Sequence, residues 1–167
     1  MMRITSFAPV GDADAQVLIL GSMPGKRSLE QQQYYAHPHN AFWRIMGELA
    51  GAHPQLPYAE RLRALQAARI ALWDVLASCM REGSLDADIC AEQANDFAAF
   101  FARHPRITRV YFNGAKAEQS FRKSVLGKRG LPLLEFHRLP STSPAHAGMS
   151  YAQKLEAWRV VMQRDRA

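Results

Sequence analysis

The sequence predicts an α/β fold in which helices cover both faces of a mostly parallel central sheet of about four strands, forming a three-layer α/β/α sandwich. Three observations support this prediction. Short apolar runs recur along the chain, amphipathic helical patterns separate them, and 167 residues with 48% hydrophobic content suffice for one core of ordinary size. Strands that alternate with helices are typical of right-handed βαβ units. We therefore expect a single domain over residues 1–167.

The strands are predicted from four short apolar runs. Residues 17–20, with the sequence VLIL, are apolar without interruption and end at Gly21. This pattern is typical of a strand buried on both faces of a parallel sheet. Similar runs lie at residues 70–73, 110–112 and 133–136.

The helices are predicted from apolar spacing and capping residues. Asn40 is a suitable N-cap for residues 41–49, whose apolar side chains recur at helical spacing. Ser150 and Gln153 form a capping box ahead of the last helix. Further helical patterns cover residues 60–68, 92–103 and 115–124.

Composition excludes several classes of protein. No apolar run approaches the roughly 20 residues of a membrane helix, and the first residues lack the apolar centre of a signal peptide. We therefore expect a soluble, cytoplasmic protein with no membrane partner. Cys79 and Cys90 are too few for a zinc site or an iron–sulfur cluster, so we expect two buried free thiols, no metal and no cofactor.

The chain carries a formal net charge of +6 and has a pI near 9.7. Such a charge suits a polyanionic partner, because neutralised phosphates release their counterions and drive association. Many basic proteins never bind nucleic acid, so the charge favours non-specific affinity without defining a function.

In a parallel sheet, ligands bind beyond the carboxyl ends of the strands, so the informative loops follow each strand. The first begins with GSMPG at residues 21–25, whose two glycines and proline suit a tight turn that brings backbone amides close to a ligand. The segment lacks the spacings of dinucleotide and nucleoside-triphosphate sites, although Lys26 and Ser28 could hold a phosphate. An ordinary turn is the alternative.

Residues 31–40 continue this loop with the sequence QQQYYAHPHN, which is rich in amides and aromatic rings. A long loop in a small domain is usually functional. Tyrosine rings can stack on a nucleobase, while amides and imidazoles can read its edge. The alternative is that Tyr34 or Tyr35 only packs and that Asn40 only caps the helix.

Residues 139–147, LPSTSPAHA, are rich in hydroxyl groups and carry two prolines. A rigid loop with short hydrogen-bond donors suits phosphate contacts near a wedge into a duplex. A lone His146 could equally be a surface residue.

The combination of GSMPG and YYAHPHNAFW near the N-terminus with STSPAHA near the C-terminus resembles the two motifs of the uracil-DNA glycosylase superfamily. It is most similar to the hypoxanthine-DNA glycosylase branch. The superfamily's first motif carries an Asn that positions the attacking water, and this sequence has Met23 there. The resemblance to the hypoxanthine branch implies that Asn40 takes over the essential role and that Tyr35 stacks against the flipped base.

By the same resemblance, Ser143 and Pro144 match the phosphate-pinching Ser-Pro of the second motif, and Ala145 and His146 lie at the wedge. Ser141 replaces a His that elsewhere steadies charge on the departing base. The amide that reads the base edge falls near Asp74, which implies an altered choice of base; a solvated carboxylate at the strand end is the alternative. The complete predicted site comprises catalytic Asn40 and Ser22, base-binding Tyr35, Met23, Asp74 and Asn113, and DNA-binding Ser141, Ser143, Pro144, His146 and Lys26.

The resemblance implies a monofunctional, monomeric DNA-deoxyinosine (hypoxanthine) glycosylase of base-excision repair. We expect it to bind double- or single-stranded DNA containing a deaminated base, in the cytoplasm and on the nucleoid. Breaking the bond builds a positively charged sugar, so Asn40 need only position a water, while Ser22 and backbone amides hydrogen-bond the leaving base. Excision of uracil or xanthine, non-catalytic binding of damaged DNA, and action on free deoxynucleosides stay open.

Overall fold

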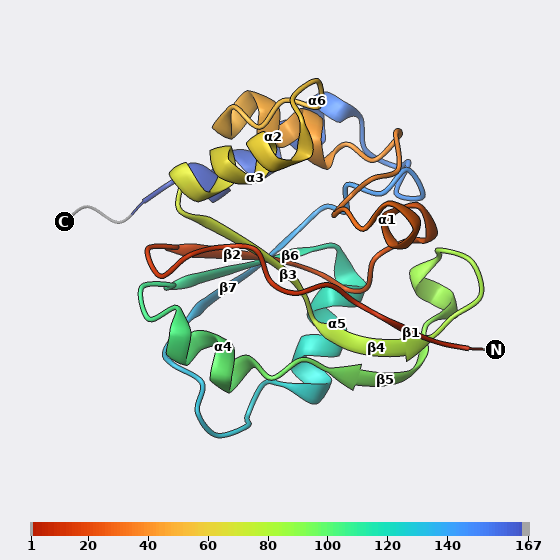
Figure 1. Cartoon of the computed structure of the whole chain (residues 1–167), viewed down its shortest axis with the longest axis vertical. Coiled ribbons are helices and arrows are strands. Elements are labelled where there is room, and N and C mark those ends of the chain that lie inside the picture. Colours follow the sequence, from red (N-terminus) through yellow and green to blue (C-terminus); the bar gives the residue numbers. More distant parts are fainter. Residues whose placement is uncertain (1, 165–167) are drawn as a thin grey trace.

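The computed structural model describes residues 2–164 and has a four-stranded parallel sheet at its centre (Figure 1). Its strands are β2 (Val17–Gly21), β3 (Ile70–Asp74), β6 (Arg109–Asn113) and β7 (Glu135–Leu139), in the order β3-β2-β6-β7. All three strand pairs are parallel, so their carboxyl ends meet at one edge. The predicted four-stranded parallel sheet is confirmed.

Helices cover both faces of this sheet (Figure 1). On one side lie α2 (Phe42–Ala50), α3 (Tyr58–Ala67) and α6 (Tyr151–Trp158), which continues into the 3₁₀ turn η2 (Arg159–Met162). On the other lie α4 (Phe97–Arg103) and α5 (Ala115–Ser124). Successive residues of β2 serve the two layers alternately: Val17 and Ile19 pack in one core, Leu18 and Leu20 in the other. The predicted three-layer sandwich is confirmed.

A second, antiparallel sheet was not predicted. It contains β1 (Arg3–Thr5), β4 (Leu76–Met80) and β5 (Cys90–Ala94), in the order β1-β4-β5. The predicted helix over residues 92–103 is therefore wrong at its start: residues 92–94 belong to β5, and α4 begins after Asp96, whose side chain accepts a hydrogen bond from the amide of Ala99. β5 has the sequence CAEQA, and its exposed side chains include good helix formers, so its residues favour the wrong structure.

Other predictions shift more locally. The last strand starts at Glu135 rather than at residue 133, and Leu133 is 98% exposed. As an edge strand paired only with β6, β7 needs no continuous apolar run. Both cysteines are free, but Cys90 is exposed, so only Cys79 matches the expectation of a buried thiol. Two short helices, α1 (Lys26–Gln31) and the 3₁₀ turn η1 (Asp86–Asp88), were also missed.

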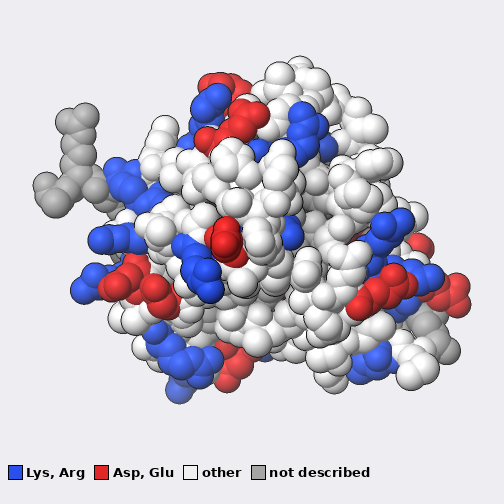
Figure 2. Space-filling view, turned by 45° about the horizontal axis from the view of Figure 1, so that its top comes forward, with Lys and Arg blue, Asp and Glu red and all other residues white. Residues whose placement is uncertain are grey.

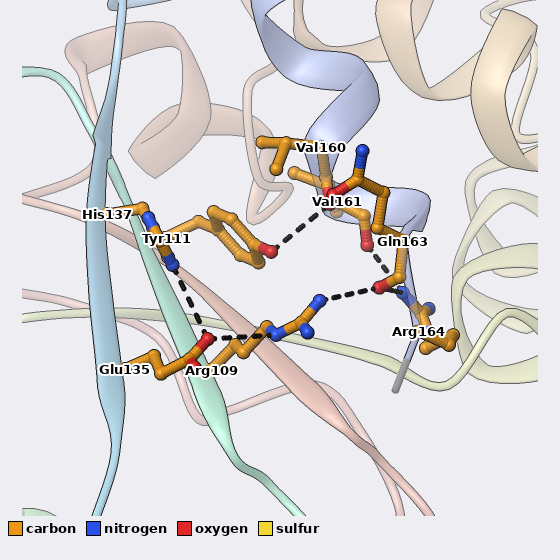
Figure 3. Close-up of polar contacts among 8 residues, drawn as sticks. All are labelled: Arg109, Tyr111, Glu135, His137, Val160, Val161, Gln163 and Arg164. Atoms are coloured by element: carbon orange, nitrogen blue, oxygen red, sulfur yellow. Dashed lines mark hydrogen bonds and ion pairs between the residues drawn. The ribbon is translucent and has the colours of Figure 1, made fainter. Parts of the chain in front are cut away.

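The C-terminal segment is held against β6 by hydrogen bonds from Arg109 at the start of that strand and from Tyr111 in its middle (Figure 3). The hydroxyl of Tyr111 donates to the carbonyl of Val160 at 3.1 Å. Arg109 donates to the carbonyl of Gln163 at 3.0 Å and pairs with Glu135 at 3.1 Å. These contacts hold the last described residues against the central sheet, away from the loops that follow the carboxyl ends of its strands. Among residues 2–164, no helix is both long and apolar enough to cross a bilayer.

Candidate active site

A cavity of about 730 Å³ lies beyond the carboxyl ends of the central strands. Its walls come from the loops after β2, β4, β6 and β7. Its volume is within the range usual for small-molecule sites. All of the residues predicted from the sequence to form the site line it: Ser22, Met23, Lys26, Tyr35, Asn40, Asp74, Asn113, Ser141, Ser143, Pro144 and His146.

The backbone at Gly21 allows two polar groups to converge at the floor of the cavity. A Cβ atom at position 21 would lie 2.5 Å from Oδ1 of Asp74 and 3.0 Å from the hydroxyl oxygen of Tyr35. Gly21 and Asp74 face each other in the register of β2 and β3. Only glycine permits this close approach, which explains the glycine at the end of the first buried strand.

Asp74 is a buried carboxyl group with an unusual environment. It is 3% exposed, and its Oδ2 has no hydrogen-bond partner among the described residues. Burial, and secondarily the charge of Asp86, raise the pKa of this carboxyl to about 7, against a lowering influence of Arg81. Asp74 is therefore no solvated strand-end carboxylate, and near neutral pH it is divided between its protonated and ionised forms.

Tyr35 and Tyr34 have different surroundings. The Tyr35 ring stacks on Phe42 with centroids 4.1 Å apart, and its buried hydroxyl has no partner among the described residues. Its φ of 55° is in the left-handed region, which is costly for a side chain of this size. Burial, then the nearby Asp74 carboxyl, raise the pKa of the Tyr35 hydroxyl, against a lowering influence of the nearby Asn113 side chain, which does not reach hydrogen-bonding geometry. The Tyr34 hydroxyl instead donates to the carbonyl of Ala8 at 2.9 Å, which makes Tyr34 a packing residue.

Asn40 is not the N-cap that the sequence predicts, because the helix begins one residue later. The N-cap of α2 is Ala41, and the Asn40 Oδ1 accepts a hydrogen bond from the amide of Phe42 at 2.9 Å. The side-chain oxygen is thus engaged with the start of the helix. The Nδ2 protons are the part of Asn40 that can donate to a ligand in the cavity.

Thr142 joins three segments of the site and was not identified from the sequence. Asn113 donates from Nδ2 to the Thr142 hydroxyl and accepts from the Thr142 amide, each at 3.0 Å. The Thr142 carbonyl accepts from the amide of Ala41 at 3.0 Å. Asn113 was predicted to bind the base, but its side-chain oxygen and one of its amide protons are hydrogen-bonded to Thr142 and hold the C-terminal loop in place. The signal in the sequence that could have identified this contact is a polar residue at the end of β6 and another just after β7, since these two strands are neighbours.

The loop carrying Ser141 and Ser143 is stiffened by its own hydroxyl groups. Ser141 accepts from the amide of Ser143 at 3.1 Å, and Ser143 accepts from the amide of Ala145 at 3.2 Å. Lys154, whose pKa is lowered by burial, donates to the carbonyl of Ser143 at 3.4 Å. Pro144 and the residues after it are exposed at the mouth of the cavity.

One wall of the cavity comes from the connection between β4 and β5, within which no residue was singled out from the sequence. Ser84, Leu85, Asp86 and Ala87 all line the cavity. The Ser22 hydroxyl donates to Oδ1 of Asp86 at 2.6 Å. The proton of Ser22, predicted to reach the leaving base, is directed toward this carboxylate instead.

Charged side chains are mixed in sign on the face shown in Figure 2. Lys and Arg side chains lie there among Asp and Glu and form no single basic patch. The net charge of +6 is therefore not concentrated on this face.

Comparison with known proteins gives consistent matches over most of the chain. The model of the family described as the uracil DNA glycosylase superfamily matches residues 8–164. A hypoxanthine DNA glycosylase from Methanosarcina acetivorans is 37% identical over 158 residues, covering 94% of this chain and 96% of that protein. A hypoxanthine DNA glycosylase from Methanosarcina barkeri is 42% identical over 117 residues, covering 70% of this chain and 74% of its own.

A solved structure agrees with these matches. The solution NMR structure of a Methanosarcina acetivorans protein, described as a candidate uracil DNA glycosylase, superposes with a TM-score of 0.78 at 36% sequence identity. The match covers 96% of this chain and 97% of that chain.

Proposed function

This chain belongs to the uracil DNA glycosylase superfamily and is a DNA glycosylase, and we propose that the base it releases is hypoxanthine, by monofunctional hydrolysis of the N-glycosidic bond. The names of the two Methanosarcina relatives support this choice of base. The observation that carries the proposal is the cavity floor, where the Tyr35 hydroxyl and the buried Asp74 carboxyl meet beside Gly21.

The floor suits a base with a lactam edge. A protonated carboxyl offers one donor and one acceptor, as an amide does. Hypoxanthine presents a carbonyl oxygen and an adjacent N–H, so a neutral Asp74 can pair with both, while an ionised Asp74 would face that oxygen with a negative charge. Adenine carries an amino group in place of the carbonyl. A donor aimed at that position, such as Nδ2 of Asn40, would be left unpaired against adenine.

The reaction needs little nucleophilic activation. The target base first leaves the helical stack, which costs a few kcal/mol and least for a mispaired base. The bond between C1′ and the base nitrogen then breaks with its electron pair on the base. Water adds to C1′, and its proton ends on the released base. Asn40 is placed to hold that water or the base edge, and Tyr35, whose ring stacks on Phe42, is the aromatic residue that would contact the base in the cavity.

Phosphate contacts are assigned to the C-terminal loop in this scheme. Ser141 and Ser143 lie at the cavity wall on a loop braced by hydrogen bonds, which favours repeatable positioning of a DNA strand. Lys26, at the exposed start of α1, adds positive charge. Because all of these residues come from one chain, we also propose that the protein acts as a monomer.

Uracil and xanthine are second candidates, because they present the same pair of carbonyl and N–H groups. The test uses duplexes that differ only in one base: hypoxanthine, xanthine, uracil or adenine. Single-turnover release is followed by alkaline cleavage of the abasic site. We expect the fastest cleavage with hypoxanthine and none with adenine. Faster cleavage with uracil would overturn the proposed choice of base, and tight binding without cleavage of any duplex would identify a non-catalytic binder.

A further inference from the structure

The connection between β4 and β5 is tied onto the turn that follows β2. Besides the 2.6 Å bond from Ser22 to Asp86, the amide of Lys26 donates to the Ser84 hydroxyl at 2.8 Å. Arg81 donates to the carbonyl of Pro24 at 2.6 Å. Three bonds therefore hold this connection against the cavity, and they fix where the Asp86 carboxylate lies.

Asp74 and Asp86 occupy different depths of the same cavity. Asp74 is 3% exposed at the floor, whereas Asp86 is exposed and lies at the wall. A nucleotide that swings out of a duplex enters base first, so the floor meets the base and the mouth meets the sugar. The unpartnered polar atoms of Tyr35 and Asp74 at the floor are an independent sign that a polar ligand is received there.

The sugar is the part of the substrate that becomes positively charged. As the bond to the base breaks, the deoxyribose approaches an oxocarbenium ion, which a fixed carboxylate stabilises without reorganising. We propose that the Asp86 carboxylate, oriented by Ser22, supplies this stabilisation. Met23, which follows Ser22 in the turn after β2, has no polar group that could supply it. Asp86 forms no bond to the substrate, and the atoms exchanged are those of the hydrolysis above, so this inference rests on the proposed function.

A purely structural role would not require Asp86 to be charged, and its negative charge disfavours DNA binding. An exposed carboxylate in the wall of a DNA-binding cavity repels the phosphates that the rest of the chain attracts. An amide would accept the Ser22 hydrogen bond equally well. The charge and the hydrogen bond can therefore be separated by one substitution. Because the charge of Asp86 also raises the pKa of Asp74, the rates are compared at a pH well below 7, where Asp74 stays protonated in both proteins.

The test is the Asp86→Asn variant, measured under single-turnover conditions on the best cleaved duplex of the base panel. We expect a rate loss of about a hundredfold, with duplex affinity unchanged or tighter and an unchanged melting temperature. Asp88→Asn is the matched control, because it removes the same charge from the same 3₁₀ turn at a residue that does not line the cavity. It should cleave at the wild-type rate. Ser22→Ala should give a smaller loss than Asp86→Asn.

Two results would overturn the inference: a wild-type rate in Asp86→Asn, or an equal loss in Asp88→Asn. Either leaves the proposed function intact as long as the wild-type protein releases a base. A wild-type protein that cleaves none of the duplexes would overturn both.

Discussion

Two buried tyrosines of the molecule differ in how their hydroxyl groups are satisfied. Tyr111, in the middle of β6, is fully buried and its hydroxyl donates to Val160 (Figure 3). Tyr35, beyond the carboxyl end of β2, has a buried hydroxyl that makes no well-formed hydrogen bond among the described residues. A paired buried polar group stabilises a fold, whereas an unpaired one indicates a place where a ligand can bind. The comparison assigns stability to the contact between β6 and η2 and chemistry to the cavity.

The largest expected effect at the carboxyl end is that of Asn40→Ser. Serine can still accept the amide proton of Phe42 at the helix start, but it has no amide protons for water or base. We expect a melting temperature near that of wild type and a loss of about a hundred- to a thousandfold in single-turnover release of hypoxanthine. Full activity in this variant would leave Asn40 with the helix contact as its whole role.

Removing the ring of Tyr35 should have the next largest effect. Stacking on an aromatic ring contributes roughly 1–3 kcal/mol per base, so Tyr35→Ala should slow release by about ten- to a hundredfold. Tyr35→Phe is the control, because it keeps the ring and its contact with Phe42. An unchanged rate in Tyr35→Ala would show that the ring only packs.

The pH dependence of stability tests the environment of Asp74. Its pKa is raised from 3.8 to about 7 in the folded protein, so folding takes up a proton between these values. Its contribution to stability is complete below the unfolded pKa and is lost as the pH rises through about 7. Between about pH 5 and pH 8, wild type should therefore lose stability relative to Asp74→Asn by an amount on the order of 1 kcal/mol or more. Denaturant unfolding of both proteins measures this, and parallel pH profiles would contradict it.

The smallest effects come from a matched pair of hydroxyl deletions. Tyr111→Phe should lower the free energy of unfolding by about 1 kcal/mol, because it removes one of the two hydrogen bonds that the Val160 carbonyl accepts, the other coming from the amide of Gln163. It should leave release of hypoxanthine unchanged. Tyr35→Phe removes a buried hydroxyl that makes no well-formed hydrogen bond among the described residues, so it should not lower stability. Equal destabilisation by both substitutions would break the comparison between the two tyrosines.

Much of the fold was predictable because its signals are local. The uninterrupted apolar run of β2 reports burial on both faces. The two motif loops, together with Asp74 at the end of β3 and Asn113 at the end of β6, bring all the predicted site residues into one cavity. β5 could not be predicted, because its exposed residues favour a helix and only pairing with β4 makes it a strand.

The parts of the site that escaped prediction depend on contacts between distant residues. Ser22 and Asp86 are 64 positions apart, and nothing in either local sequence indicates that they meet. Asn113 was predicted to bind the base, but its contact with Thr142, which looks like an ordinary loop residue, becomes visible only when the fold brings the two residues together. Sequence motifs therefore located the site, and the tertiary structure was needed to show which side chains hold the others.

The most direct test of the central claim is chemical identification of what the protein releases from a deoxyinosine-containing duplex. Mass spectrometry of the small-molecule fraction, together with alkaline cleavage of the remaining strand, follows both products of one turnover. Hydrolysis of the glycosidic bond at the carboxyl end of the sheet predicts free hypoxanthine in equal amount to abasic sites, and loss of both products in Asn40→Ser. Release of intact deoxyinosine, or an unaltered duplex, would contradict it.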